Sequence, residues 1–222
     1  MRELVTFFAL AFAALLPLIN PVGDALIFLG MVGTAPPSVY LSLAKRIAIS
    51  TTVFMLVIEG MGTAVFKFFG ISLPVMQVSG GFVIAAMGWN LLNQSEASAT
   101  EKKAAIDGSK DYASLDEMVF YPLTFPITAG PGCIVVMVTL SAHASGAGLV
   151  PEVAAHAGIV LAVVLLSIAV YFCYGYAPAI TARVRPASLH GILRVIAFVL
   201  LCIGVQIAWN GAQVLLKALH TS

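Results

Sequence analysis

Residues that could bind a charged solute lie in the middle of two long apolar stretches. The first set is Asn20-Pro21-Val22-Gly23-Asp24, inside the apolar run from Leu4 to Val32. The second set is Ala129-Gly130-Pro131-Gly132, inside the run from Val119 to Ala142. Proline suits the first position of a helix when Asn or Gly precedes it as the N-cap. Each set therefore predicts a break in the apolar stretch and a new helix that begins at its proline.

Each of these helix starts could hold an anion. The first N–H groups of a helix have no partner within it, and the helix dipole favours negative charge there. Asp24 lies in the first turns of its half-helix, where it is either a cap that stabilises the break or a contact for a solute or coupling ion. In the second case the amides would hold the carboxylate of a zwitterion, and Asp24 would face its ammonium group. The predicted binding residues are Asn20, Pro21, Gly23, Asp24, Thr128, Gly130, Pro131, Gly132 and Gln206.

Glu59 is the second carboxylate deep in an apolar stretch, where a charge costs about 2.5 to 3.5 kcal/mol on insertion scales. It is either a proton site or an interfacial residue that reaches the lipid headgroups. Asp24 and Glu59 are therefore the candidates for coupling to an ion. The side chains of Gln206, Asn210 and Gln213 share one helix face, and they either line a cavity or join helices by hydrogen bonds.

Membrane spans are the elements that would position these residues. The 222-residue chain is 60% hydrophobic and 9% charged, and its mean hydropathy is +1.02. This composition excludes a water-soluble domain of this length. The predicted fold class is an all-α integral membrane protein with six transmembrane helices, at Leu4–Val32, Ile47–Phe69, Leu73–Leu92, Val119–Ala142, Val153–Tyr176 and Ile192–Leu216.

Three spans precede a polar linker over residues 94–118, and three follow it. The predicted organisation is a first repeat over 1–93 and a second over 119–222. Because three is an odd number, the second repeat would enter the membrane from the opposite side, which gives two inverted repeats with broken first helices and a site where they meet. The pair Gly80-Gly81 in the third span is predicted to allow another helix to approach closely.

The placement of basic residues predicts the orientation of the chain. By the positive-inside rule, loops rich in Lys and Arg face the cytoplasm. Arg2, Lys67 and Lys217 lie on one side of the predicted spans. The other eight basic residues lie in or beside the loops after spans one, three and five: Lys45, Arg46, Lys102, Lys103, Lys110, Arg183, Arg185 and Arg194. The linker is therefore predicted to be cytoplasmic and both termini to be outside the cytoplasm.

Motifs for other chemistry are not found in the sequence. There is no Ser/His/Asp set, no pair of carboxylates on one helix and no phosphate loop, so neither an enzyme nor an ATP-driven pump without a partner subunit is predicted. The cysteines lie within predicted spans, and the histidines lie near span ends without metal-binding spacing. No cofactor and no metal site is therefore predicted.

Several short motifs follow one another along nearly the whole chain: Asn20-Pro21-Val22-Gly23, Ile27-Phe28, Arg46, Phe69-Gly70-Ile71-Ser72, Gly80-Gly81, Pro122-Leu123, Pro126, Gly130-Pro131-Gly132, Arg194, Gln206 and Gly211. In this order they resemble the motifs of the MarC family. This family comprises six-span inner-membrane proteins of bacteria and archaea, similar to small neutral amino-acid transporters of the SnatA type. Two positions depart from the pattern: the family usually has Asn where this chain has Asp24, and Glu59 matches no family position.

The resemblance implies secondary transport of glycine- or alanine-like amino acids by alternating access. The absence of an ATP-binding motif implies that a proton or sodium gradient drives it. Asp24 in place of a neutral residue would instead favour a cationic solute or a bound proton. The alternatives are an exporter of another small metabolite, an intramembrane enzyme that uses Asp24 and Glu59, and a non-transporting scaffold. The expected partners are a small-molecule solute and the lipid bilayer, with no nucleic acid; assembly into a homo-oligomer stays open.

Overall fold

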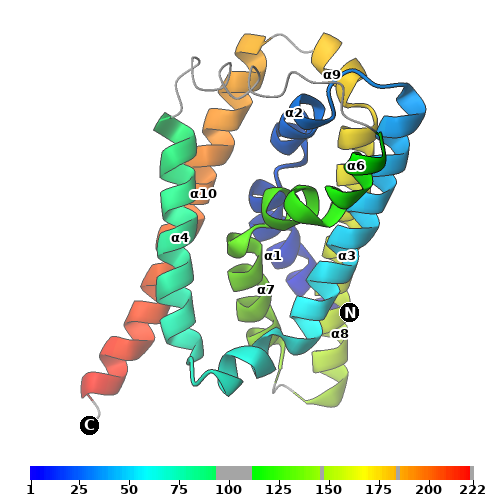
Figure 1. Ribbon diagram of the computed structural model, residues 1–222. Helices are drawn as coiled ribbons and strands as arrows, with labels where there is room; N and C mark the ends of the chain where they lie inside the picture. The colour runs from blue at the N-terminus through cyan, green and yellow to red at the C-terminus, as the bar shows by residue number, and fades with distance from the viewer. Residues whose placement is uncertain (94–111, 146–147, 184–185, 221–222) are drawn as a thin grey trace.

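A computed structural model describes residues 1–93, 112–145, 148–183 and 186–220. All the regular elements of this described part are helical, and the chain folds into a bundle of long helices (Figure 1). The elements are α1 (Arg2–Ile19), α2 (Pro21–Val32), α3 (Pro37–Phe68), α4 (Leu73–Asn93), α6 (Tyr112–Glu117), η1 (Val119–Thr128), α7 (Pro131–Ala144), α8 (Leu149–Gly175), α9 (Ala177–Arg183) and α10 (Pro186–His220).

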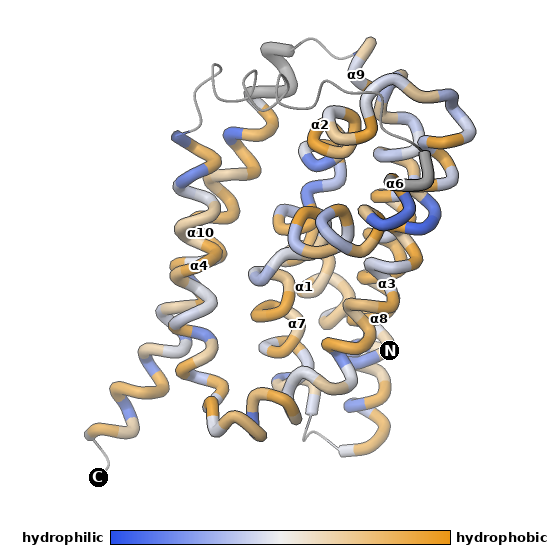
Figure 2. The backbone as a smooth tube through the Cα atoms, in the orientation of Figure 1, coloured by the Kyte–Doolittle hydropathy of each residue, from blue (hydrophilic) through white to orange (hydrophobic). Residues whose placement is uncertain are grey.

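Five of the helical segments are long and apolar enough to cross a membrane: α1 with α2, then α3, α4, α8 and α10. Up to six crossings result if η1 and α7, which meet at an angle of 68°, count as one broken span. Hydrophobic residues line these helices along most of their length (Figure 2). Many of them are exposed, as lipid-facing helices require. The predicted all-α membrane protein is thus confirmed, although α3 begins ten residues before the span predicted at Ile47.

Helices α4 and α10 lie side by side along most of their length (Figure 1). Glycines bring their backbones together: a Cβ atom added at Gly81 would lie 2.4 Å from the backbone nitrogen of Ala208, and one added at Gly204 would lie 2.3 Å from that of Ala85. The neighbouring Gly80 receives the side chain of Val135 from α7. The predicted close approach at Gly80-Gly81 is therefore confirmed, and it follows the general use of small residues between membrane helices.

The first break forms as predicted. Asn20 has a left-handed backbone (φ 40°, ψ 60°), which few residues other than Gly and Asn adopt. Its Oδ1 accepts a hydrogen bond of 3.2 Å from the N–H of Gly23, and Pro21 is the first residue of α2. Asn20 thereby ends α1 and caps α2.

The second break lies between Thr128 and Pro131, with Gly130 as the N-cap of α7. The part of the predicted span Val119–Ala142 that precedes this break is an irregular helix, η1. Tyr121 and Phe125 have extended backbones within η1, because the ring of a following proline disfavours the helical conformation. The Tyr121-Pro122 and Phe125-Pro126 peptide bonds are cis.

The linker predicted over 94–118 falls largely outside the described residues, which resume at Tyr112. Its last part forms α6, where the carboxylate of Asp116 lies 2.5 Å from the guanidinium of Arg46 on α3. Both side chains are more than half exposed. Exposed ion pairs contribute little to stability, so this one orients α6 on α3 and adds little to the stability of the fold.

Candidate functional site at the paired breaks

The two breaks pack against each other in the middle of the bundle. A Cβ atom added at Gly132, just after the second break, would lie 2.7 Å from Cδ2 of Leu18, just before the first. The same atom would lie 3.0 Å from Cγ1 of Ile84 on α4. The structure therefore brings two half-helix N-termini together, at residues Asn20-Pro21-Val22-Gly23 and Gly130-Pro131-Gly132, with α4 beside them.

The carboxylate of Asp24 lies between elements that are far apart in the sequence. It is close enough to Cys133 on α7 and Tyr174 on α8 for its charge to act on both. The side chain is partly buried. Among the hydrogen bonds of the described residues, none involves this carboxylate, unlike the cap of Asn20. Within the described part of the chain, Asp24 is therefore a carboxyl group without a hydrogen-bonding partner, beside two helix starts.

Thr128 and an aromatic cluster border this region. The hydroxyl of Thr128 donates to the carbonyl of Leu123 at 2.7 Å, so the hydroxyl of Tyr174, 2.8 Å away, donates to Thr128. The ring of Tyr174 stacks on Phe28 of α2 at a centroid distance of 4.9 Å. Thr128, Tyr174 and Phe28 are fully buried. Sequence reasoning missed Tyr174, because a tyrosine in an apolar span carries no signal without its neighbours.

Within the described residues, Gln206 makes no hydrogen bond to the other predicted binding residues. It is exposed on α10, and its amide donates to Oδ1 of Asn210 at 2.8 Å. Helix α10 reaches the first break through another residue, Leu193, whose Cδ2 would lie 2.8 Å from a Cβ atom added at Gly23.

Glu59 occupies a second polar site, where α3 meets α7 and α8. Its side chain is 7% exposed, and Oε1 lies 2.5 Å from Nδ1 of His156 on α8. Ser141 of α7 donates to the backbone carbonyl of Glu59 at 3.1 Å. A buried, paired carboxylate does not reach outward as an interfacial residue would. His156 was missed in the sequence, because nothing in its local pattern indicates a partner on another helix.

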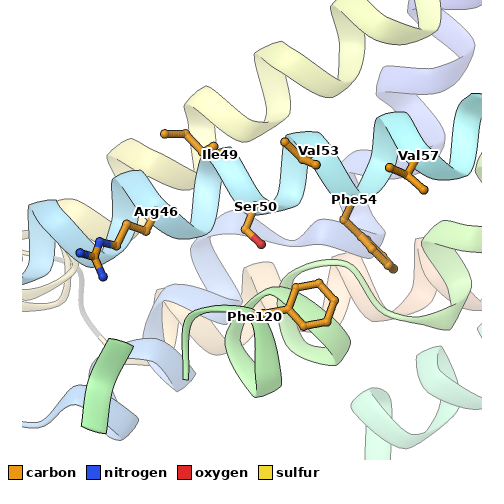
Figure 3. A pocket seen from close by; sticks show the side chains of 7 residues that line it. All are labelled: Arg46, Ile49, Ser50, Val53, Phe54, Val57 and Phe120. Carbon is orange, nitrogen blue, oxygen red and sulfur yellow. The ribbon is translucent and has the colours of Figure 1, made fainter. Parts of the chain in front are cut away.

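Two pockets are described, and neither is lined by the break residues. One, of about 570 Å³, opens beside Glu59 and His156 and is also lined by Gly60, Thr63, Ala64, Lys67, Ser141 and Ser145. The other, of about 470 Å³, is an apolar groove between α3 and η1 where the rings of Phe54 and Phe120 turn toward each other (Figure 3). Arg46 lies at one end of this groove (Figure 3).

Comparisons with known proteins agree with the membrane fold. Residues 5–216 match the model of the family described as MarC family integral membrane protein. The inner membrane protein MarC of Salmonella typhimurium is 27% identical over 222 residues, which cover 99% of this chain and all of the relative. Its namesake from Escherichia coli O1:K1 / APEC is 28% identical over 228 residues, with the same coverage. No solved structure matches the chain. Because the family model covers nearly its whole length, the chain belongs to the MarC family of integral membrane proteins.

Proposed function

We propose that this protein is a secondary transporter of small neutral amino acids, of the glycine or alanine type. Its location would be the inner membrane, as the names of its relatives indicate. The observation that carries the proposal is the unpartnered carboxylate of Asp24 beside two adjoining helix N-termini. The helix starts would hold the carboxylate of the solute, and Asp24 would hold its ammonium group. The close packing of Leu18 and Ile84 around Gly132 favours a solute with a small side chain.

The pairing of the helices supports alternating access between two inverted halves. Helix α3 packs against the broken span of the second half, η1 with α7, while α8 packs against the broken span of the first half, α1 with α2. Two further contacts join equivalent helices, α3 with α8 and α4 with α10. Exchange of the two halves maps these four contacts onto one another, as expected of two repeats related by a two-fold axis.

Ligand-induced stabilisation tests whether the site takes a zwitterion. We expect glycine and alanine to raise the melting temperature of the purified protein, since a ligand at 100 times its Kd stabilises by about 2.7 kcal/mol. Acetate and methylammonium each carry only one of the two charges, and either alone should stabilise far less. Equal stabilisation by acetate would indicate a plain anion site, and no stabilisation by either amino acid would contradict the proposal.

Gly132→Leu should abolish glycine binding, because its side chain would push Leu18 and Ile84 away from the first turn of α7, against which they pack. Gly132→Ala should bind nearly normally, since its Cβ atom meets only the flexible end of Leu18 and the side chain of Ile84. Gly30→Leu on α2 is the matched control, because a Cβ atom there meets nothing within 4 Å. Normal binding by a folded Gly132→Leu variant would place the solute elsewhere.

For the orientation, we propose a cytoplasmic linker and termini outside the cytoplasm. The test introduces single cysteines at Ser109, Ser188 or Ser222 in a variant without the three native cysteines. An impermeant thiol reagent added to intact cells should label the cysteine at position 222 and spare the other two. Labelling at positions 109 and 188 but not at 222 would show the opposite orientation and contradict this proposal.

A further inference from the structure

The pair formed by Glu59 and His156 is unequally exposed. The side chain of Glu59 is 7% exposed and that of His156 is 30% exposed, and both line the pocket of about 570 Å³. The carboxylate has little direct access to water, whereas the imidazole ring has more. Nδ1 is hydrogen-bonded to Oε1 of Glu59. Nε2 is therefore the nitrogen through which the ring can exchange a proton with water in the pocket.

One oxygen of this carboxylate is left without a partner. Oε2 of Glu59 is buried and accepts no hydrogen bond within the described residues, and Oγ1 of Thr63, one turn further along α3, is in the same state. A buried carboxylate oxygen without a donor is costly while the group is charged. Addition of a proton to the pair removes the negative charge of the carboxylate, and with it the cost of burying Oε2 without a donor.

His156 is the one group in the described residues whose charge acts noticeably on Glu59. Lys67 lines the same pocket from α3. The other charged or titratable groups on this part of the neighbouring helices are His143 on α7, Glu152 on α8, and Arg2 and Glu3 at the start of α1. With a neutral imidazole, the pair carries a net charge of −1 in the span.

We propose that Glu59 and His156 form a proton-binding pair, which is loaded from the pocket at the end of the bundle opposite the linker. A hydronium ion in the pocket gives its proton to Nε2 of His156 and leaves as water. The Nδ1 proton then passes to Oε1 of Glu59, so that a neutral imidazole with its proton on Nε2 faces a neutral carboxylic acid. One proton has been bound, and the net charge of the pair has changed from −1 to zero.

The role of this pair would be to couple transport to a proton gradient, and this role rests on the proposed function. A neutral pair can be sealed from water at a much lower cost than a charged one. The helices that hold it, α3 and α8, pack directly on each other and each contacts a broken span. Proton loading would therefore favour closure of the pocket as the solute site changes its access.

Proton binding can be measured on the purified full-length protein without any amino acid. Nitrogen NMR of labelled histidine side chains follows the four rings through a pH titration, and the His156→Gln variant identifies the signal of His156. We expect Glu59→Gln to change the chemical shift of Nδ1 of His156, because its hydrogen bond of 2.5 Å to a carboxylate is lost. Glu117→Gln, which removes an exposed carboxylate on α6, is the matched control and should not change this chemical shift. A chemical shift of Nδ1 that stays the same in Glu59→Gln overturns the pair.

Transport measurements test the coupling separately. In proteoliposomes, Glu59→Gln and His156→Gln should lose accumulation of labelled glycine driven by a pH gradient, while they keep the exchange of internal for external glycine. Glu59→Asp retains a carboxylate and should recover gradient-driven accumulation in part. If both Gln variants still accumulate glycine in response to the pH gradient, the coupling role is wrong although transport stands. If the parent protein moves no glycine, the NMR titration still decides whether the pair exists.

Discussion

Replacement of Asp24 by Asn is expected to weaken glycine and alanine binding roughly 10- to 150-fold. The reason is the loss of one charge-assisted contact to the ammonium group, worth about 1.5 to 3 kcal/mol. The substitution should weaken ligand binding and leave the stability of the fold nearly unchanged. The Asp24 carboxylate makes no hydrogen bond among the described residues, and Asn20 already caps α2. Asn is also nearly the same size as Asp, so the packing should be kept.

The measurement is the dissociation constant of glycine for the purified protein, with Glu117→Gln as a control that removes a carboxylate on α6, away from the breaks. Acetate binding gives a second readout, because acetate has no ammonium group and Asp24→Asn should not weaken it. If Asp24→Asn binds glycine as tightly as the parent protein does, Asp24 only supports the break and the ammonium contact is wrong.

A large loss of stability is expected from Gly81→Ala. The added methyl group would lie 2.4 Å from the backbone nitrogen of Ala208 and 2.6 Å from the carbonyl oxygen of Gly204. Overpacking a tight interface typically costs about 1 to 3 kcal/mol. Here the clash is with helix backbone, which cannot rotate away as a side chain can, so we expect the upper end of that range and a loosened α4–α10 pair.

Thermal unfolding in detergent measures this effect. The control is Gly60→Ala on α3, where a Cβ atom would meet nothing within 4 Å. That change should leave stability nearly constant or raise it by up to about 1 kcal/mol, since Ala favours helix over Gly. Equal melting temperatures for Gly81→Ala and the parent protein would mean that α4 and α10 are not packed backbone to backbone.

Much of this fold could be predicted from local signals. A long apolar run indicates a span, and Asn20-Pro21 and Gly130-Pro131 indicate helix starts, because the N-cap and the missing proline N–H act within a few residues. The irregular η1 was accessible by the same logic, since Tyr121 and Phe125 both precede proline. It was missed because hydropathy alone cannot distinguish a helix from an extended apolar segment.

The side-chain partners within the candidate sites could not be predicted in this way. Thr128 meets Tyr174 across 46 residues of chain, and Glu59 meets His156 across 97. These contacts depend on which helices pack together and at what rotation, and the sequence pattern of a single span does not contain that information. The hydrogen bond between Gln206 and Asn210 is different, because these residues lie one turn apart on the same helix face. Their sequence pattern did not show that this face is exposed.

Uptake of labelled glycine by proteoliposomes that contain the purified protein tests the proposed transport most directly. A pH gradient and a sodium gradient are imposed separately, and empty vesicles and vesicles with Gly132→Leu serve as controls. We expect the parent protein to accumulate glycine above the level of both controls when the pH gradient is present, and unlabelled alanine to compete with it. Uptake no greater than that of empty vesicles under either gradient would contradict the assignment of this protein as an amino-acid transporter.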